Sequence, residues 1–101
     1  MSKNGMHPIH PGEVLREEYL EPLNMSADAL ARAIGVSAPT VNEIVRERRG
    51  ITADIALRLS SAFGCTAQFW MNMQSAYELR LAETTKGDEI RSSIKRLDQV
   101  A

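Results

Sequence analysis

Two short amphipathic segments separated by one glycine, within residues 26–50, restrict the fold of this 101-residue chain more than any other feature of its sequence. Each segment has apolar residues at intervals of three and four, the spacing that places side chains on one face of a helix. These residues are Ala27, Leu30, Ala31 and Ile34 in the first segment and Val41, Ile44 and Val45 in the second. Gly35 follows the first segment and can adopt the positive φ that often ends a helix. The spacing therefore predicts two short helices joined by a tight turn.

The second of these helices is predicted to begin after Ser37, whose hydroxyl can cap it, and to carry small and polar side chains opposite its apolar stripe. These side chains are Ala38, Pro39, Thr40, Asn42, Glu43 and Arg46, and Arg48 and Arg49 follow in the next turn. Short polar side chains can approach base edges and arginines can contact phosphates. The pattern is typical of a helix-turn-helix, whose second helix enters the major groove of DNA. The alternative is an ordinary helical hairpin in an all-α core, and the arginine-rich turn favours DNA binding over it.

The charge distribution is uneven, although the net charge of −1 is unusual for a protein that binds nucleic acid. Residues 1–31 have a net charge of −3, whereas residues 32–58 have a net charge of +2. The predicted DNA-contacting segment therefore lies in the basic part of the chain. The acidic N-terminal segment is either a solvated helix face or a surface that attracts a basic protein partner.

Several classes of function are disfavoured by the composition. Cys65 is the only cysteine, so neither an intrachain disulfide nor a thiolate metal cluster is expected. His7 and His10 lie in a turn-rich arm that we expect to be mostly exposed, and no further ligand completes a metal site there. No nucleophile–base pair or phosphate-binding glycine loop is present, so we expect neither an enzyme nor a cofactor. Without a long apolar run or a signal-like segment, the chain is expected to be soluble and cytoplasmic, with no membrane association.

Three further helices complete the predicted all-α domain. One spans about Gly12–Leu20 and is ended by Pro22, and another follows the cap residue Thr52 and is closed by Gly64. The fifth helix runs from after Thr66 to about Ala82 and carries more apolar surface than one helix face needs. Such a surplus favours a homodimer interface over a helix that is deeply inserted in its own domain. The residues assigned to this interface are Phe69, Trp70, Met71, Met73 and Tyr77.

The expected organisation is an N-terminal arm at 1–10, a helix-turn-helix domain at 11–82 and a C-terminal tail at 83–101. Residues 84–89 have the composition of a linker. The residues beyond it include Ile90, Ile94 and Leu97 at helical spacing, which is too few apolar side chains for an independent core. This segment is either a frayed terminal helix or one that a partner orders.

Three separated motifs resemble the HigA (also called VapI) family of antitoxins: the segments 10–23, 50–59 and 67–77. The resemblance covers about residues 7–82. It implies a five-helix, lambda-repressor-like domain of the XRE type that dimerises through its fifth helix. It also implies that the protein neutralises a small, basic HigB-type mRNA endonuclease toxin and binds double-stranded operator DNA to repress its own operon. A stand-alone XRE-type repressor without a toxin is the alternative.

The family roles, carried over to this sequence, place Ser37 near a phosphate and Arg46, Arg48 and Arg49 near the DNA backbone. The residues placed along the groove are Ala38, Pro39, Thr40, Asn42 and Glu43. Glu47 departs from the family pattern, in which glycine commonly follows the recognition helix. Because a left-handed conformation at a non-glycine residue costs roughly 1 kcal/mol, we expect the turn to be shifted toward Gly50. Glu43 is expected to face the groove, where a carboxylate can accept from a cytosine amino group.

Overall fold

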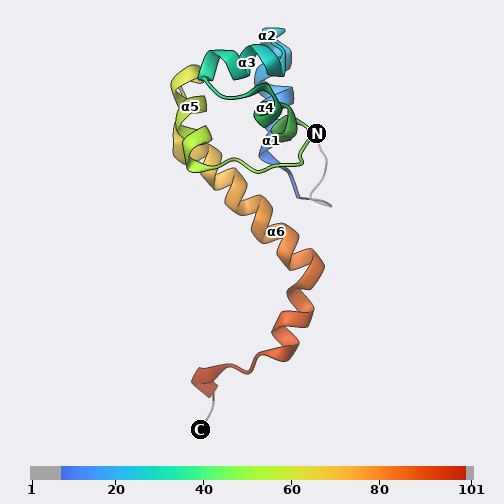
Figure 1. Ribbon diagram of the computed structural model, residues 1–101. Helices are drawn as coiled ribbons and strands as arrows, with labels where there is room; N and C mark the ends of the chain where they lie inside the picture. The colour runs from blue at the N-terminus through green and yellow to red at the C-terminus, as the bar shows by residue number, and fades with distance from the viewer. Residues whose placement is uncertain (1–7, 100–101) are drawn as a thin grey trace.

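The structure is a computed structural model that describes residues 8–99, and the regular structure in this range is helical without a strand. Residues 11–23 form one continuous helical segment made of α1 (Pro11–Val14), the π-helical turn η1 (Leu15–Leu20) and α2 (Glu21–Leu23). It is followed by α3 (Ala27–Ile34), α4 (Ala38–Val45), α5 (Ala53–Phe63), α6 (Ala67–Ser93) and the 3₁₀ turn η2 (Leu97–Gln99) (Figure 1). The expected all-α, five-helix fold is therefore confirmed, with residues 11–23 as the first helix. Of the expected arm at 1–10, only residues 8–10 lie within the described part.

The predicted N-termini of α3 to α6 agree with the observed capping. Four hydroxyl side chains each accept a hydrogen bond from the backbone N–H three residues later, which satisfies one unpaired donor of the helix that follows. These residues are Ser26, Ser37, Thr52 and Thr66. Gly35 and Gly64 both adopt φ of 76°, as expected for glycines that end a helix.

The first helix continues past Pro22, contrary to the prediction. In η1 the hydrogen bonds widen, and the N–H of Glu21 donates to the carbonyl of Arg16, five residues earlier. Pro22 follows directly in the first turn of α2, a position where the missing N–H of proline is tolerated. The helix ends instead at Asn24, which has a φ of 53°.

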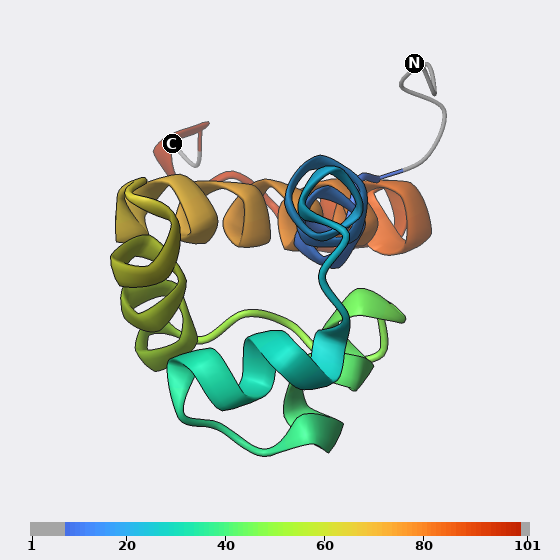
Figure 2. The same ribbon diagram turned by 90° about the horizontal axis from the view of Figure 1, so that it is seen from above.

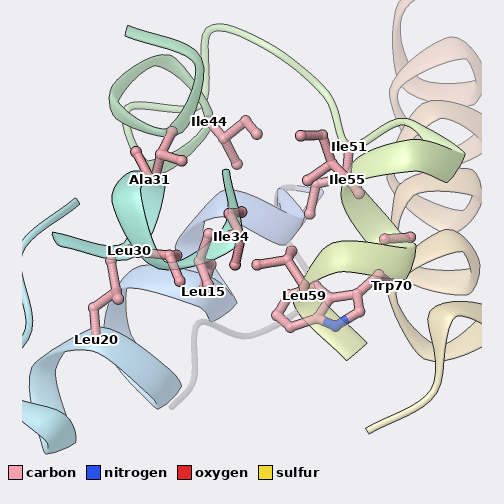
Figure 3. Packing of buried hydrophobic residues seen from close by; sticks show 12 residues of the cluster. Leu15, Leu20, Leu30, Ala31, Ile34, Ile44, Ile51, Ile55, Leu59 and Trp70 are labelled. Carbon is pink, nitrogen blue, oxygen red and sulfur yellow. The ribbon is translucent and has the colours of Figure 1, made fainter. Parts of the chain in front are cut away.

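The hydrophobic core is formed by side chains from all five helices and by Ile51 in the loop before α5. Trp70 of α6 is fully buried, with 0% of its surface exposed, and lies beside Leu59 of α5 (Figure 3). Its ring packs 5.2 Å from the Tyr19 ring, and its indole N–H donates to Sγ of Cys65 at 3.1 Å. The assignment of Trp70 to a dimer interface is therefore wrong, because its own chain covers the side chain completely. Cys65 is half-buried and serves as an acceptor for the indole.

The first helix packs against both α4 and α6. In Figure 2 it crosses α6, while α3 and α4 lie on the opposite side of the bundle and α5 joins the two sides. The contact of α1 with α4 is very close at Gly12, where an added Cβ would lie 1.8 Å from the carbonyl oxygen of Ile44. Glycine at this position therefore permits the backbone of α1 to touch the end of α4.

Helix α6 is longer than predicted, and the segment assigned as a linker at 84–89 is part of it. Arg91 binds both Glu83, at 2.9 Å, and Asp88, at 3.2 Å, and so bridges the turn that contains Gly87. The pair of Arg91 with Asp88, three residues earlier, has a spacing that stabilises a helix, here through a sequence that composition alone marks as a linker. The distal half of α6 projects away from the bundle (Figure 1), with exposed apolar side chains that include Leu79 and Ile90.

Candidate nucleic-acid interface

The turn between α3 and α4 is held by a contact from α5, and the two helices that flank it are joined by a side-chain hydrogen bond. Nη1 of Arg58, on α5, donates to the carbonyl of Ile34 at 2.8 Å, and Asp54 anchors the same guanidinium at 2.6 Å. Asn42, on α4, donates through Nδ2 to Oδ1 of Asp28 on α3 at 2.8 Å. The relative placement of the two helices is therefore fixed by side chains as well as by their apolar stripes.

Asn42 takes a different position from the one expected of a groove residue. Its amide nitrogen also donates to the carbonyl of Ala38 at 2.9 Å, so both N–H groups of the amide are used inside the helix pair. In this structure Asn42 braces α4 against α3.

The first turn of α4 presents small polar groups to solvent. The hydroxyls of Ser37 and Thr40 are hydrogen-bonded to each other at 2.7 Å, and the Ser37 hydroxyl also accepts from the Thr40 N–H. Ser37 and Pro39 are exposed, and Ala38 and Thr40 are half-buried. This end of the helix therefore combines two hydroxyls with short side chains that allow close approach of another molecule.

Glu43 and Arg49 form an ion pair across the exposed face of α4. Oε1 of Glu43 lies 2.9 Å from Nη2 and 3.1 Å from Nε of Arg49, and Nη1 of Arg49 donates to the Thr40 hydroxyl at 3.3 Å. The two paired side chains are each 47% exposed. The negative charge of Glu43 on this face is thus offset by a neighbouring arginine.

The turn after α4 is tight, and its left-handed residue is Glu47, with a φ of 64°. The expected shift of this turn toward Gly50 is wrong, since Gly50 does not have a positive φ. The side-chain amide of Gln74 lies 2.7 Å from the position that a Cβ of Gly50 would take, and its Oε1 accepts from the N–H of Ile51 at 2.7 Å. Gly50 therefore leaves room for the Gln74 side chain of α6.

Arg16 holds Glu47 in this conformation, and sequence reasoning did not identify it. Its guanidinium donates to the backbone carbonyl of Val45 and lies 3.3 Å from the Glu47 carboxylate. Burial lowers the pKa of Arg16, but hydrogen bonds and charge from Glu17 and Glu47 outweigh it, so the pKa is raised overall. These partners are 31 residues apart, and no local pattern in the sequence connects them.

Arg46 and Arg48 are exposed beside this turn. Within residues 8–99 their side chains take part in no ion pair, in contrast to Arg49. The structure therefore brings all the sequence-predicted DNA-contacting residues to α4 and its flanking turns. It leaves Arg46 and Arg48 extended toward solvent.

His10 is buried, which corrects the expectation of an exposed arm at this position. Its Nδ1 accepts from the Gly12 N–H at 2.8 Å and so caps α1, and its ring packs edge-on against Tyr77 at 4.7 Å. Burial lowers its pKa, the nearby Glu47 charge opposes this effect, and Arg16 adds to it. The described residues contain no cluster of side chains suited to hold a metal, and His7 lies outside them.

The other residues assigned to a dimer interface remain accessible. Phe69 is 37% exposed, and Met71, Met73 and Tyr77 are half-buried along α6. Met73 and Tyr77 also line a shallow apolar groove between α6 and the chain around Ile9.

The geometry of α3, α4 and the turn between them defines a DNA-binding protein of the helix-turn-helix class, and residues 17–70 match a family model described as Helix-turn-helix. The chain is 63% identical over 84 residues to virulence-associated protein I of Dichelobacter nodosus, which covers 83% of this chain and 78% of that protein. It belongs to the HigA (VapI) family of antitoxins.

Solved structures of antitoxins have the same fold. Antitoxin GraA superimposes with a TM-score of 0.90 at 58% identity, over 92% of this chain and 100% of that one. The Pseudomonas aeruginosa antitoxin HigA, solved with the higBA promoter, superimposes with a TM-score of 0.87 at 56% identity, over 90% of this chain and 99% of that one. In residues 8–99, no helix combines the length and apolar character that a membrane span requires.

Proposed function

We propose that this chain is a cytoplasmic antitoxin that binds operator DNA as a homodimer, represses its own operon and neutralises a HigB-type toxin. The observation that carries the proposal is the exposed polar face of α4, with three arginines directly after its last turn, in a chain whose relative HigA was solved with promoter DNA. The proposal assigns no catalytic step to this chain.

Helix α4 would enter the major groove with its first turn leading. The hydroxyls of Ser37 and Thr40 and the small side chains of Ala38 and Pro39 are suited to close contact with backbone and base edges. Arg46 and Arg48 extend from the end of the helix, where they can reach phosphates. Asn42 would act by keeping α4 in place on α3.

Dimerisation would occur along α6 through Phe69, Met71, Met73 and Tyr77, the members of the predicted interface that are accessible. A two-fold dimer presents two copies of α4, and these must lie about 34 Å apart to enter successive major grooves. The operator is then expected to be a palindrome with matching half-site spacing.

The proposal is tested by expressing the chain with the product of its neighbouring gene, purifying the complex and measuring its binding to the shared promoter over a range of salt concentrations. We expect a stable complex and steeply salt-dependent binding. Binding without a co-purified partner would contradict the antitoxin part, and a complex that does not bind the promoter would contradict the repressor part.

The role of Arg46 can be measured in the same assay. Arg46→Ala should weaken binding and reduce the slope of log K against log salt by about 0.9 for each phosphate contact, or about 1.8 for a dimer. Lys95→Ala, a charge change in the exposed segment after α6, serves as the control and should leave the slope unchanged. An unchanged slope in Arg46→Ala would remove this residue from the phosphate contacts.

A further inference from the structure

Arg49 is held differently from the other arginines beside α4. Instead of extending into solvent, its side chain lies back across the exposed face of the helix, where it contacts Glu43 and Thr40. Thr40 is itself hydrogen-bonded to Ser37, so the guanidinium is the last member of a short polar chain. These contacts orient the guanidinium along the exposed face of α4.

The pattern of contacts leaves a defined pair of donors. A guanidinium has five N–H groups. Within residues 8–99, Nε–H donates to Glu43 and one N–H of Nη1 donates to Thr40, while Nη2 lies 2.9 Å from the same Glu43 oxygen as an ion pair. At least one N–H therefore remains on each terminal nitrogen. Two parallel N–H donors of an arginine match O6 and N7 of guanine in the major groove, which is the commonest specific contact between a side chain and a base.

We propose that Arg49 reads a guanine in each half-site and that Glu43 is the residue that positions it. The inference rests on the proposed function, because it requires α4 to enter the major groove. A phosphate contact needs only positive charge within reach, whereas bidentate recognition of a base needs an oriented guanidinium. Glu43 supplies the orientation before DNA is bound, so less side-chain freedom is lost on binding.

The same pairing gives Glu43 a role that fits its place on a DNA-facing surface. A lone carboxylate there would be repelled by phosphates, but the contact with Arg49 at 2.9 Å offsets its charge. Glu43 therefore contributes to specificity through Arg49, rather than through direct acceptance from a cytosine amino group.

The test is a scan of the promoter duplex with 7-deazaguanine, which replaces N7 by a C–H group and preserves base pairing. Each guanine of the operator is replaced in turn, and binding is measured for the full-length wild type and for the variants Arg49→Ala, Arg49→Gln and Glu43→Gln. Arg48→Ala is the matched control, because Arg48 lies in the same turn without such partners. Thermal melting confirms that each variant is folded.

We expect one guanine in each half-site at which the replacement weakens wild-type binding by roughly fivefold or more. A complete bidentate base contact is worth roughly 5- to 150-fold, and the replacement removes one of its two acceptors. Arg49→Ala should bind the modified and unmodified duplexes equally, and Arg49→Gln, whose amide can still donate to N7, should show a smaller ratio than the wild type. Glu43→Gln should show a smaller ratio at the same guanine and no change at the others. Arg48→Ala should bind all duplexes more weakly and keep the full ratio.

Three results would overturn the inference. If the Arg49 variants retain the wild-type ratio at every guanine, Arg49 contacts only phosphate or no DNA at all. If Glu43→Gln retains the full ratio, Glu43 does not position Arg49. If the wild-type chain does not bind the promoter at all, the proposed function fails as well, which distinguishes that failure from the first two.

Discussion

Gly12→Ala is expected to be strongly destabilising, although alanine is normally the better residue in a helix. The added Cβ would lie 1.8 Å from the carbonyl oxygen of Ile44 and 2.8 Å from its carbonyl carbon. Cβ atoms essentially never approach other atoms closer than 3.0 Å, so α1 and α4 must separate by about 1 Å or more. Both sides of this contact are backbone, and no side chain can rotate to relieve it.

The magnitude follows from two opposed terms. Overpacking of this kind costs about 3 kcal/mol or more, since backbone must move. The better helix propensity of alanine returns at most about 1 kcal/mol. The net loss of about 2–3 kcal/mol corresponds to a fall in Tm of roughly 10–20 °C for a domain of this size. Because the Ile44 carbonyl also accepts from the Glu47 N–H at 2.9 Å, the turn after α4 should be disturbed and promoter binding weakened.

Gly64→Ala is the matched control, because nothing lies within 4 Å of its added Cβ and only its φ of 76° opposes the change. That substitution should cost about 1–2 kcal/mol. Thermal melting by circular dichroism compares the two variants. If Gly12→Ala melts within a few degrees of the wild type, or above Gly64→Ala, the close contact of α1 with α4 is not a rigid constraint.

Two further substitutions test the electrostatics and the backbone strain. Neutral His10 caps α1 and has a lowered pKa, so its stabilisation is present above its ordinary value of 6.5 and is lost as the pH falls toward the folded value. His10→Asn retains a capping group that does not titrate. Denaturation of each protein at pH 7.5 and at pH 5 should therefore show that the variant loses less stability between the two pH values than the wild type does. Equal losses would contradict this role of His10. Glu47→Gly removes a left-handed strain of about 1–2 kcal/mol, and it also removes an exposed ion pair with Arg16 that is worth at most about 1 kcal/mol. A modest rise in Tm is therefore expected. A fall in Tm would show that the ion pair with Arg16 contributes more than the strain costs.

Local signals in the sequence predicted the helices well. A capping hydroxyl such as Ser37 and a terminal glycine such as Gly35 act on backbone groups a few residues away, so their effect is visible in the sequence itself. The residues assigned to the DNA-facing surface follow from the same local periodicity. They lie on α4 and its flanking turns because those boundaries were predicted correctly.

The parts that were not predicted depend on contacts between distant segments. Glu47 adopts a left-handed conformation beside Arg16, which lies 31 residues earlier in the chain. Gly50 leaves room for the side chain of Gln74, which belongs to α6. Helical spacing showed that Trp70 lies on an apolar stripe, but it does not tell whether the chain itself or a second subunit covers that stripe. Likewise, the composition of residues 84–89 could not reveal that these residues are helical. They belong to α6, and Arg91 forms ion pairs with Glu83 and Asp88 along this part of the helix.

Helix α6 begins inside the domain and ends outside it. Its first turns are fixed by buried Trp70 and by Gln74, which is hydrogen-bonded to the loop before α5. An isolated helix of about 15 residues is marginal in water, because its first turn is costly to form. Residues 79–93 need no such nucleation, since they extend turns that the domain already holds. This distal part should therefore unwind gradually from Ser93, while the first turns unfold only with the domain. Helix α6 is therefore continuous in the structure, but its first turns and its distal part are expected to unfold separately.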